Sequence, residues 1–153
     1  MVQLTAKERM LMQDQKAHEE LCVQKYQNYS DQAQNPQLKQ LFNSLAQKEQ
    51  EHLNSINQIL GGQIPNLQQS QQQSGQQIQY NPMQGAMANQ NDAALCNDML
   101  ATEKYISGTY DTTIFECTDT NVRQVLNHIQ KEEQEHGEQI FNYMQSNGMY
   151  NPQ

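Results

Sequence analysis

The sequence predicts an all-α fold, a four-helix bundle made of two repeated helical hairpins that are joined by a long crossover. Two observations support this prediction. Apolar residues recur at the three- and four-residue spacing of a helix face in four separate segments. The two halves of the chain also repeat each other at a constant offset of 84 residues, which aligns Glu19 with Glu103. We therefore expect a single domain over residues 1–153, because this length suits one hydrophobic core.

The first hairpin is expected at residues 5–35 and 36–60. Thr5 and Glu8 have the spacing of a capping box, in which each side chain accepts a hydrogen bond from the backbone amide of the other residue. The Asn-Pro pair at residues 35–36 favours a second helix start, since Asn is a good N-cap and Pro suits the first helical position.

The second hairpin is expected at residues 91–117 and 119–147. Gly108 lies inside the first of these helices, where glycine costs about 1 kcal/mol relative to alanine, and we expect close packing against a neighbour to explain it. Residues 63–90 are rich in Gln, with Ser, Asn, Gly and Pro between them. Such a segment buries little surface. We interpret it as a crossover linker, with association through the Gln tract as the alternative.

The composition excludes several classes of partner. The net charge is −8, the pI is about 4.8 and the chain has no Lys/Arg cluster, so neither nucleic acid nor an anionic membrane is an expected partner. There is no apolar run long enough to span a membrane and no signal-peptide core, which predicts synthesis and retention inside a cell. The three cysteines lack metal-site spacing and are expected to be buried or semi-buried free thiols. They are Cys22, Cys96 and Cys117.

Six acidic or imidazole side chains interrupt the apolar faces of the expected helices. They are Glu19, Glu49, His52, Glu103, Glu133 and His136. Four of them form two Glu-x-x-His pairs, in which the two side chains share one helix face. With a rise of about 1.5 Å per residue, the lone glutamate and the Glu-x-x-His pair of each hairpin lie roughly 21 to 24 Å from the turn, at nearly the same height. Hairpins packed face to face would therefore gather all six side chains in one layer.

Four carboxylates in a shared core cannot all stay charged and unpaired, because each would cost several kcal/mol in desolvation. No Lys or Arg is expected at their level, whereas two divalent cations would neutralise four glutamates and bind two neutral histidines. Di-iron and di-manganese carboxylate proteins have this ligand set. Oxygen and imidazole donors suit Fe or Mn, so we expect two Fe or Mn ions. A protonated polar layer and a register in which these residues face water are the alternatives.

Tyr26 and Tyr110 follow the two lone glutamates by seven residues, about two turns along the same face. They could donate hydrogen bonds to the glutamate of the opposite hairpin and orient it, or be plain core aromatics. Six further side chains fall off the apolar faces and are expected to be solvated. They are His18, His128, Glu20, Glu51, Glu132 and Glu135. No catalytic residue is assigned.

The layout of the six ligands resembles that of the ferritin-like superfamily, especially the rubrerythrin-like four-helix domains. This resemblance implies an up-down-down-up bundle and chemistry with peroxide or O₂. The chain differs from rubrerythrins because it has no electron-transfer domain with four cysteine ligands.

The order of residues in several segments is similar to that of another family. Residues 92–100, 118–126 and 139–144 resemble the Coat F family of spore coat proteins, and residues 35–42 echo the same pattern in the first half. This resemblance implies incorporation into the spore coat through other coat proteins as partners, with a homo-oligomer as a further option. The first functional hypothesis is therefore a structural coat protein with a metal-stabilised bundle. A di-metal oxidoreductase is the second, and iron storage in a hollow cage is the third.

Overall fold

The computed structural model describes residues 1–68 and 89–151. Within these ranges the chain forms four α-helices and no β-strand, which confirms the predicted all-α class. The helices are α1 (Ala6–Gln32), α2 (Pro36–Leu60), α3 (Gln90–Glu116) and α4 (Thr120–Ser146). Most of the predicted crossover lies outside the described residues. None of the described helices is long and apolar enough to span a membrane.

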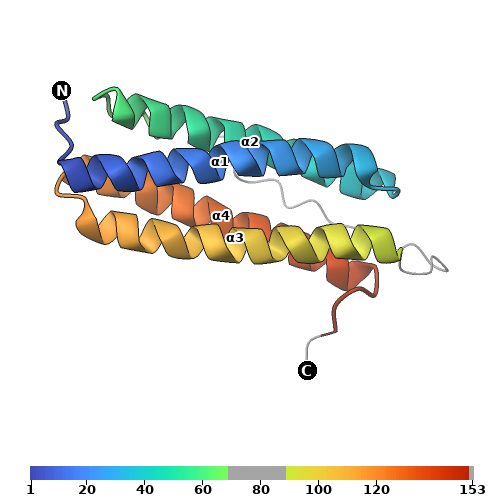
Figure 1. Ribbon diagram of the computed structural model, residues 1–153. Coiled ribbons are helices and arrows are strands. Elements are labelled where there is room, and N and C mark those ends of the chain that lie inside the picture. The colour runs from blue at the N-terminus through green and yellow to red at the C-terminus, as the bar shows by residue number, and fades with distance from the viewer. Residues whose placement is uncertain (69–88, 152–153) are drawn as a thin grey trace.

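The four helices lie side by side as two hairpins (Figure 1). α1 runs away from the N-terminus and α2 returns beside it, whereas α3 runs in the same direction as α2 and α4 returns. α1 packs against α2 and α3, and α4 packs against α3 and α2. As a result, α2 ends at the opposite end of the bundle from the start of α3.

Side-chain caps fix the beginning of each helix. Thr5 accepts a hydrogen bond from the amide of Glu8 at 3.1 Å and Glu8 accepts one from the amide of Thr5 at 2.6 Å, so the predicted capping box is confirmed. Asn35 caps α2 and Asp119 caps α4. α3 begins at Gln90, one residue earlier than expected, because the side chain of its cap, Asn89, accepts hydrogen bonds from the amides of Asn91 and Asp92.

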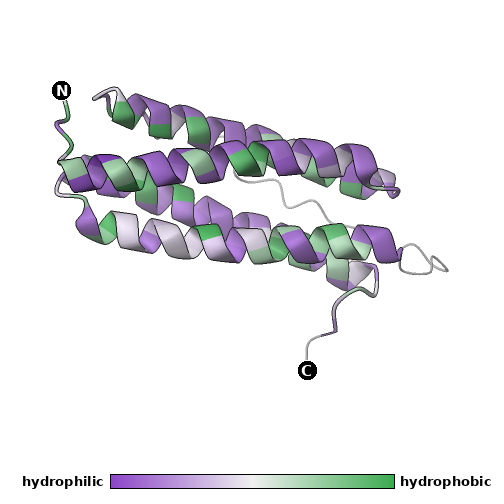
Figure 2. Cartoon of the chain, in the orientation of Figure 1, coloured by the Kyte–Doolittle hydropathy of each residue, from purple (hydrophilic) through white to green (hydrophobic). Residues whose placement is uncertain are grey.

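The core is formed by the apolar faces of all four helices. Its large and nearly inaccessible side chains include Met12, Leu38, Leu41, Phe42, Leu45, Ile56, Ile59, Met99 and Ile106. Figure 2 shows that much of the outward-facing surface of the helices is hydrophilic. Burial of this apolar face, rather than intrinsic helix propensity, stabilises such long helices in water.

Two sequence expectations about the core have different outcomes. The three cysteines are buried free thiols, as predicted. The expectation that close packing explains Gly108 is wrong, because a Cβ added there would meet no atom within 4 Å. Gly108 is exposed on α3, and nothing in the described structure explains its presence there.

A reciprocal pair of acidic clamps joins the two hairpins at both ends. The Glu8 carboxylate accepts hydrogen bonds from the amide and the hydroxyl of Thr118, at 2.6 and 3.0 Å. The Asp92 carboxylate accepts hydrogen bonds from the amides of Gln34 and Asn35, at 2.9 and 3.0 Å. Glu8 and Asp92 occupy equivalent repeat positions, and each binds the turn of the opposite hairpin. Neither clamp was predicted from the sequence.

We expect Glu8→Gln to destabilise the protein at neutral pH and to have little effect in acid. Burial raises the pKa of Glu8, but hydrogen bonds from Thr5 and Thr118 outweigh it and lower this pKa below its ordinary value near 4.5. A lowered pKa in the folded state means that the stabilisation is present above pH 4.5 and is lost as pH falls through the folded-state value. The loss at pH 7 should be about 1 to 3 kcal/mol in the free energy of unfolding.

Urea unfolding of the metal-free proteins, followed by circular dichroism at several pH values, measures this difference. Glu20→Gln is the matched control, because Glu20 is exposed on the same helix. A penalty for Glu8→Gln that stays constant from pH 7 to strongly acidic pH would contradict the clamp.

Candidate metal centre

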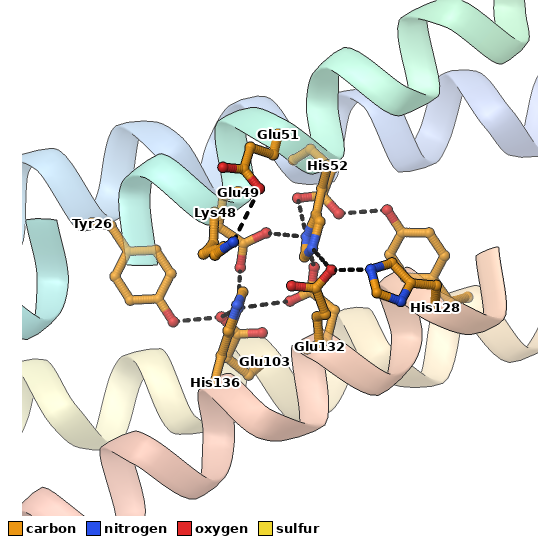
Figure 3. A network of polar contacts seen from close by, with 12 residues as sticks. Tyr26, Lys48, Glu49, Glu51, His52, Glu103, His128, Glu132 and His136 are labelled. Carbon is orange, nitrogen blue, oxygen red and sulfur yellow. Dashed lines mark hydrogen bonds and ion pairs between the residues drawn. The ribbon is translucent and has the colours of Figure 1, made fainter. Parts of the chain in front are cut away.

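The bundle brings all six predicted ligands together in one buried layer, which Figure 3 shows from close by. None of these side chains is more than 3% exposed. Each hairpin contributes a lone glutamate from its first helix and a Glu-x-x-His pair from its second helix. The alternative register, in which these residues face water, is therefore wrong.

The layer divides into two overlapping sets of donor atoms. In each set, one atom from every residue lies within 4.8 Å of the others. The first set is Glu19, Glu49, His52 and Glu133. The second set is Glu49, Glu103, Glu133 and His136. Glu49 and Glu133 belong to both sets, so the geometry offers two cation positions with two shared carboxylates.

Both histidines direct the same ring nitrogen at the carboxylates. The Nδ1 atom of His52 lies 3.1 Å from Glu49 Oε2 and 2.9 Å from Glu133 Oε1. The Nδ1 atom of His136 lies 3.0 Å from Glu49 Oε1. The two rings are stacked, with centroids 5.5 Å apart and an angle of 15° between their planes. The centre thus has an approximate two-fold symmetry that follows the sequence repeat.

Two buried tyrosines hold the lone glutamates across the hairpins. The Tyr26 hydroxyl donates a hydrogen bond to Glu103 Oε1, and the Tyr110 hydroxyl donates one to Glu19 Oε1. Burial and the neighbouring carboxylates raise the pKa of both phenols well above 10, so each stays a donor at neutral pH. Of the two interpretations that the spacing of the tyrosines left open, these contacts agree with hydrogen bonding to the opposite glutamate.

The layer carries more negative charge than its surroundings tolerate. Burial raises the pKa of Glu49 and Glu133 well above 4.5, and the charges of Glu19 and Glu103 raise both further. In the absence of cations, these two shared carboxyl groups therefore bind protons more tightly than ordinary glutamates. Protons and divalent cations compete for the same oxygen atoms.

The unpaired atoms of the layer allow a test of whether cations fit. Among the described residues, Oε2 atoms of Glu19, Glu103 and Glu133 are buried without a hydrogen-bond partner. An unsatisfied buried acceptor costs about 1 to 3 kcal/mol, and a divalent cation satisfies it. Six oxygen and imidazole donors suit Fe or Mn. The residues present fit two such ions.

Glu132 was expected to face outward into solvent. This expectation is wrong, because the side chain lies buried beside the candidate ligands. It is 5% exposed, and its Oε1 atom lies 2.5 Å from His128 Nε2 and 3.7 Å from His52 Nε2. Burial raises the pKa of Glu132, but the contact with His52 and the charges of His52, His128 and Lys48 lower it to about 2. Glu132 is therefore an anion at the edge of the layer of candidate ligands.

His128 and His18 were both expected to be solvated, but both are partly buried. The side chain of His128 is 17% exposed because it packs beside Glu132, one turn away on α4. His18 is half-buried between α1 and α3, with Nδ1 3.4 Å from Thr109 Oγ1. Three glutamates were also expected to face solvent. Glu20 and Glu51 are exposed, and Glu135 is partly exposed.

One signal in the sequence could have revealed the pair of His128 and Glu132. The offset of 84 residues aligns His128 with Ser44 and Glu132 with Lys48, so the repeat is broken at both positions. Two residues one helical turn apart, both of types that bind protons or metals, replace residues of other types there.

Comparison with known families agrees with part of this picture. Residues 91–153 match the model of the Coat F domain. No curated protein and no solved structure matches the chain. The matched region contains α4, all of α3 except Gln90, and half of the candidate ligands, and the other half comes from α1 and α2. The second half of the chain is thus similar to the Coat F domain, as the sequence resemblance predicted.

Proposed function

We propose that this chain is a spore coat protein whose bundle core binds two divalent ions, iron or manganese. The match of residues 91–153 to the Coat F domain supports the coat role. The observation that carries the metal proposal is the pair of overlapping donor sets that share Glu49 and Glu133. We also propose a ferritin-like relationship for the bundle, which its helix directions and its ligand layout support.

Each residue has a distinct task in this proposal. Glu49 and Glu133 contribute to both cation positions and offset the charge of two ions. Glu19 with His52, and Glu103 with His136, complete the separate positions. The tyrosine hydroxyls keep the lone glutamates in place. Bound ions would supply Lewis-acid and redox chemistry at positions that the six side chains leave open.

A structural role follows directly from the placement of the ligands. They come from all four helices, so a bound ion pair would connect both hairpins at mid-height. Ligands that bind only the folded state stabilise it by mass action. Such stabilisation suits a structural protein of the spore coat.

A rubrerythrin-like oxidoreductase that consumes peroxide or O₂ is the second candidate. The observation that favours it is the number of protein ligands, since six donors for two ions leave room for a small oxidant. The test is peroxide consumption by the iron-loaded full chain with an added electron donor. A rate equal to the background rate would exclude this candidate and leave the coat proposal unaffected.

We expect a tagged copy of the chain to localise to the coat of sporulating cells and to appear in coat extracts of purified spores. The Coat F similarity is the reason for this expectation. Fluorescence microscopy and immunoblotting of coat extracts measure it. The Glu49→Gln/Glu133→Gln variant in the same strain shows whether coat incorporation requires the metal layer. Diffuse signal in the cell, together with an unchanged coat in a deletion strain, would contradict the coat role.

A further inference from the structure

The two cation positions of the proposed centre differ in one neighbour. Glu132 lies beside His52, and the repeat-equivalent residue Lys48 does not provide an acceptor for His136. The Lys48 ammonium instead lies 3.1 Å from Glu51 Oε2 at the surface. The approximate two-fold symmetry of the ligands therefore does not extend to the residues behind them.

The contrast is visible in the contacts of the two imidazoles. His52 Nδ1 faces the carboxylates, and its Nε2 atom is buried and has no hydrogen-bond partner within the described residues. Glu132 Oε1 lies 3.7 Å from this Nε2 atom (Figure 3). For His136, the polar contacts among the described residues all involve Nδ1.

His128 restrains the Glu132 carboxylate from the outer side. Its Nε2 atom lies 2.5 Å from the same oxygen that faces His52, and its own side chain is still partly exposed. His128, Glu132 and His52 thus form a row that leads from the surface to the metal layer. Its residues come from α4 and from the adjacent face of α2.

The chemistry of metal-bound imidazole gives this row a role. A histidine that binds a cation through Nδ1 carries its proton on Nε2. A carboxylate that accepts a hydrogen bond from that proton fixes the tautomer, orients the ring and makes the ligand more basic. Loss of such a partner typically weakens metal binding about 10- to 100-fold.

We propose that Glu132 is a positioning residue that accepts the Nε2–H hydrogen bond of His52 and makes the Glu19–His52 position the tighter of the two cation sites. This inference rests on the proposed metal centre. It predicts ordered loading, with the first divalent ion bound beside His52 and the second beside His136. A different role for Glu132, as a ligand of a third ion with His52 and His136, is geometrically available because the three groups lie within 4.8 Å of one another.

Cobalt(II) titration of the metal-free full chain tests the proposal. The wild type should bind two ions in two resolved steps. Absorption spectroscopy and calorimetry monitor the titration. Glu132→Gln should weaken the first step about 10- to 100-fold and leave the second step nearly unchanged. Glu135→Gln is the matched control, since Glu135 lies on the same helix outside both donor sets.

¹H–¹⁵N correlation NMR of the histidine rings in the zinc-loaded wild type tests the proposal without a variant, because it shows which ring nitrogen carries the proton. The proposal requires the proton of His52 on Nε2, with slow solvent exchange and the chemical shift of a strong hydrogen bond. In Glu132→Gln this signal should move and exchange faster, while the signals of His136 stay in place. A wild-type His52 that carries its proton on Nδ1 would overturn the proposal even if the variant does not fold.

The remaining outcomes separate this inference from the function on which it rests. Failure of the wild type to bind cobalt(II) would remove both the metal centre and the role of Glu132. If each of the two binding steps has the same affinity in the wild type and in Glu132→Gln, only the role of Glu132 would be removed. Three ions per chain, reduced to two in the variant, would show that Glu132 is a ligand and would also overturn the positioning role.

Discussion

Metal-free wild-type protein is expected to melt at a lower temperature than its own Glu49→Gln/Glu133→Gln variant, and saturating iron(II) or manganese(II) is expected to reverse this order. The metal-free wild type places two shared carboxyl groups, with raised pKa values, among other buried carboxylates. Glutamine keeps the shape and is neutral in both the folded and the unfolded state, so it neither buries a charge nor takes up a proton on folding. With metal, the wild type gains about 4 kcal/mol for an ion supplied at 1,000 times its Kd, and the variant gains little.

Thermal unfolding with and without metal, together with metal content by mass spectrometry, measures both halves of this prediction. The wild type purified without chelators should contain about two ions per chain, because the layer offers two donor sets. Glu51→Gln/Glu135→Gln is the matched control, since these residues lie two positions further along the same helices outside both sets. A variant with unchanged melting temperature and unchanged metal content would show that the six residues form no site.

The Tyr26→Phe/Tyr110→Phe variant is expected to bind both ions much more weakly than the wild type. Each tyrosine hydroxyl is a hydrogen-bond donor to one lone glutamate from the opposite hairpin. Without that donor, the carboxylate has an additional unsatisfied oxygen and a less defined orientation. The loss of an orienting partner typically costs about 10- to 100-fold in affinity, and here both positions lose one.

Competition with a metallochromic chelator measures the two affinities, and circular dichroism checks that the variant is folded. Tyr29→Phe is the control, because the Tyr29 hydroxyl lies 2.7 Å from Asp98 and belongs to neither donor set. Affinities equal to those of the wild type would mean that Tyr26 and Tyr110 are only core aromatics. Weakening at a single position would mean that only one of the two hydrogen bonds matters for binding.

The layer of six candidate ligands could be predicted from the sequence, because the helical period and the 84-residue repeat both place these residues on buried faces at the same height. The helical period places Glu19 and Glu49 on apolar faces, and the repeat places Glu103 and Glu133 on the same faces in the other hairpin. Charged residues on an apolar face are costly unless they are partnered. Their height along the bundle follows from a constant rise per residue, so no knowledge of side-chain conformation was needed.

Glu132 could not be placed in the same way, because its position depends on the distance between helices. It neighbours Glu133 in the sequence and lies about 100° around α4, at the edge of the buried face. Whether such an edge position is covered depends on how closely α2 approaches, and the sequence does not encode this distance in any period. The clamps of Glu8 and Asp92 are a similar case, since they join segments far apart in the chain.

The reciprocal bonds between the hairpins have a consequence for how the protein is assembled. In the two clamps and in the tyrosine pairs, hydrogen bonds run both from the first hairpin to the second and from the second to the first. This is the contact pattern of an isologous dimer, in which the same surface patch serves both partners. The protein is thus organised as a dimer of hairpins contained in one chain. Two separate polypeptides, residues 1–68 and 89–153, would carry complementary halves of every one of these pairs.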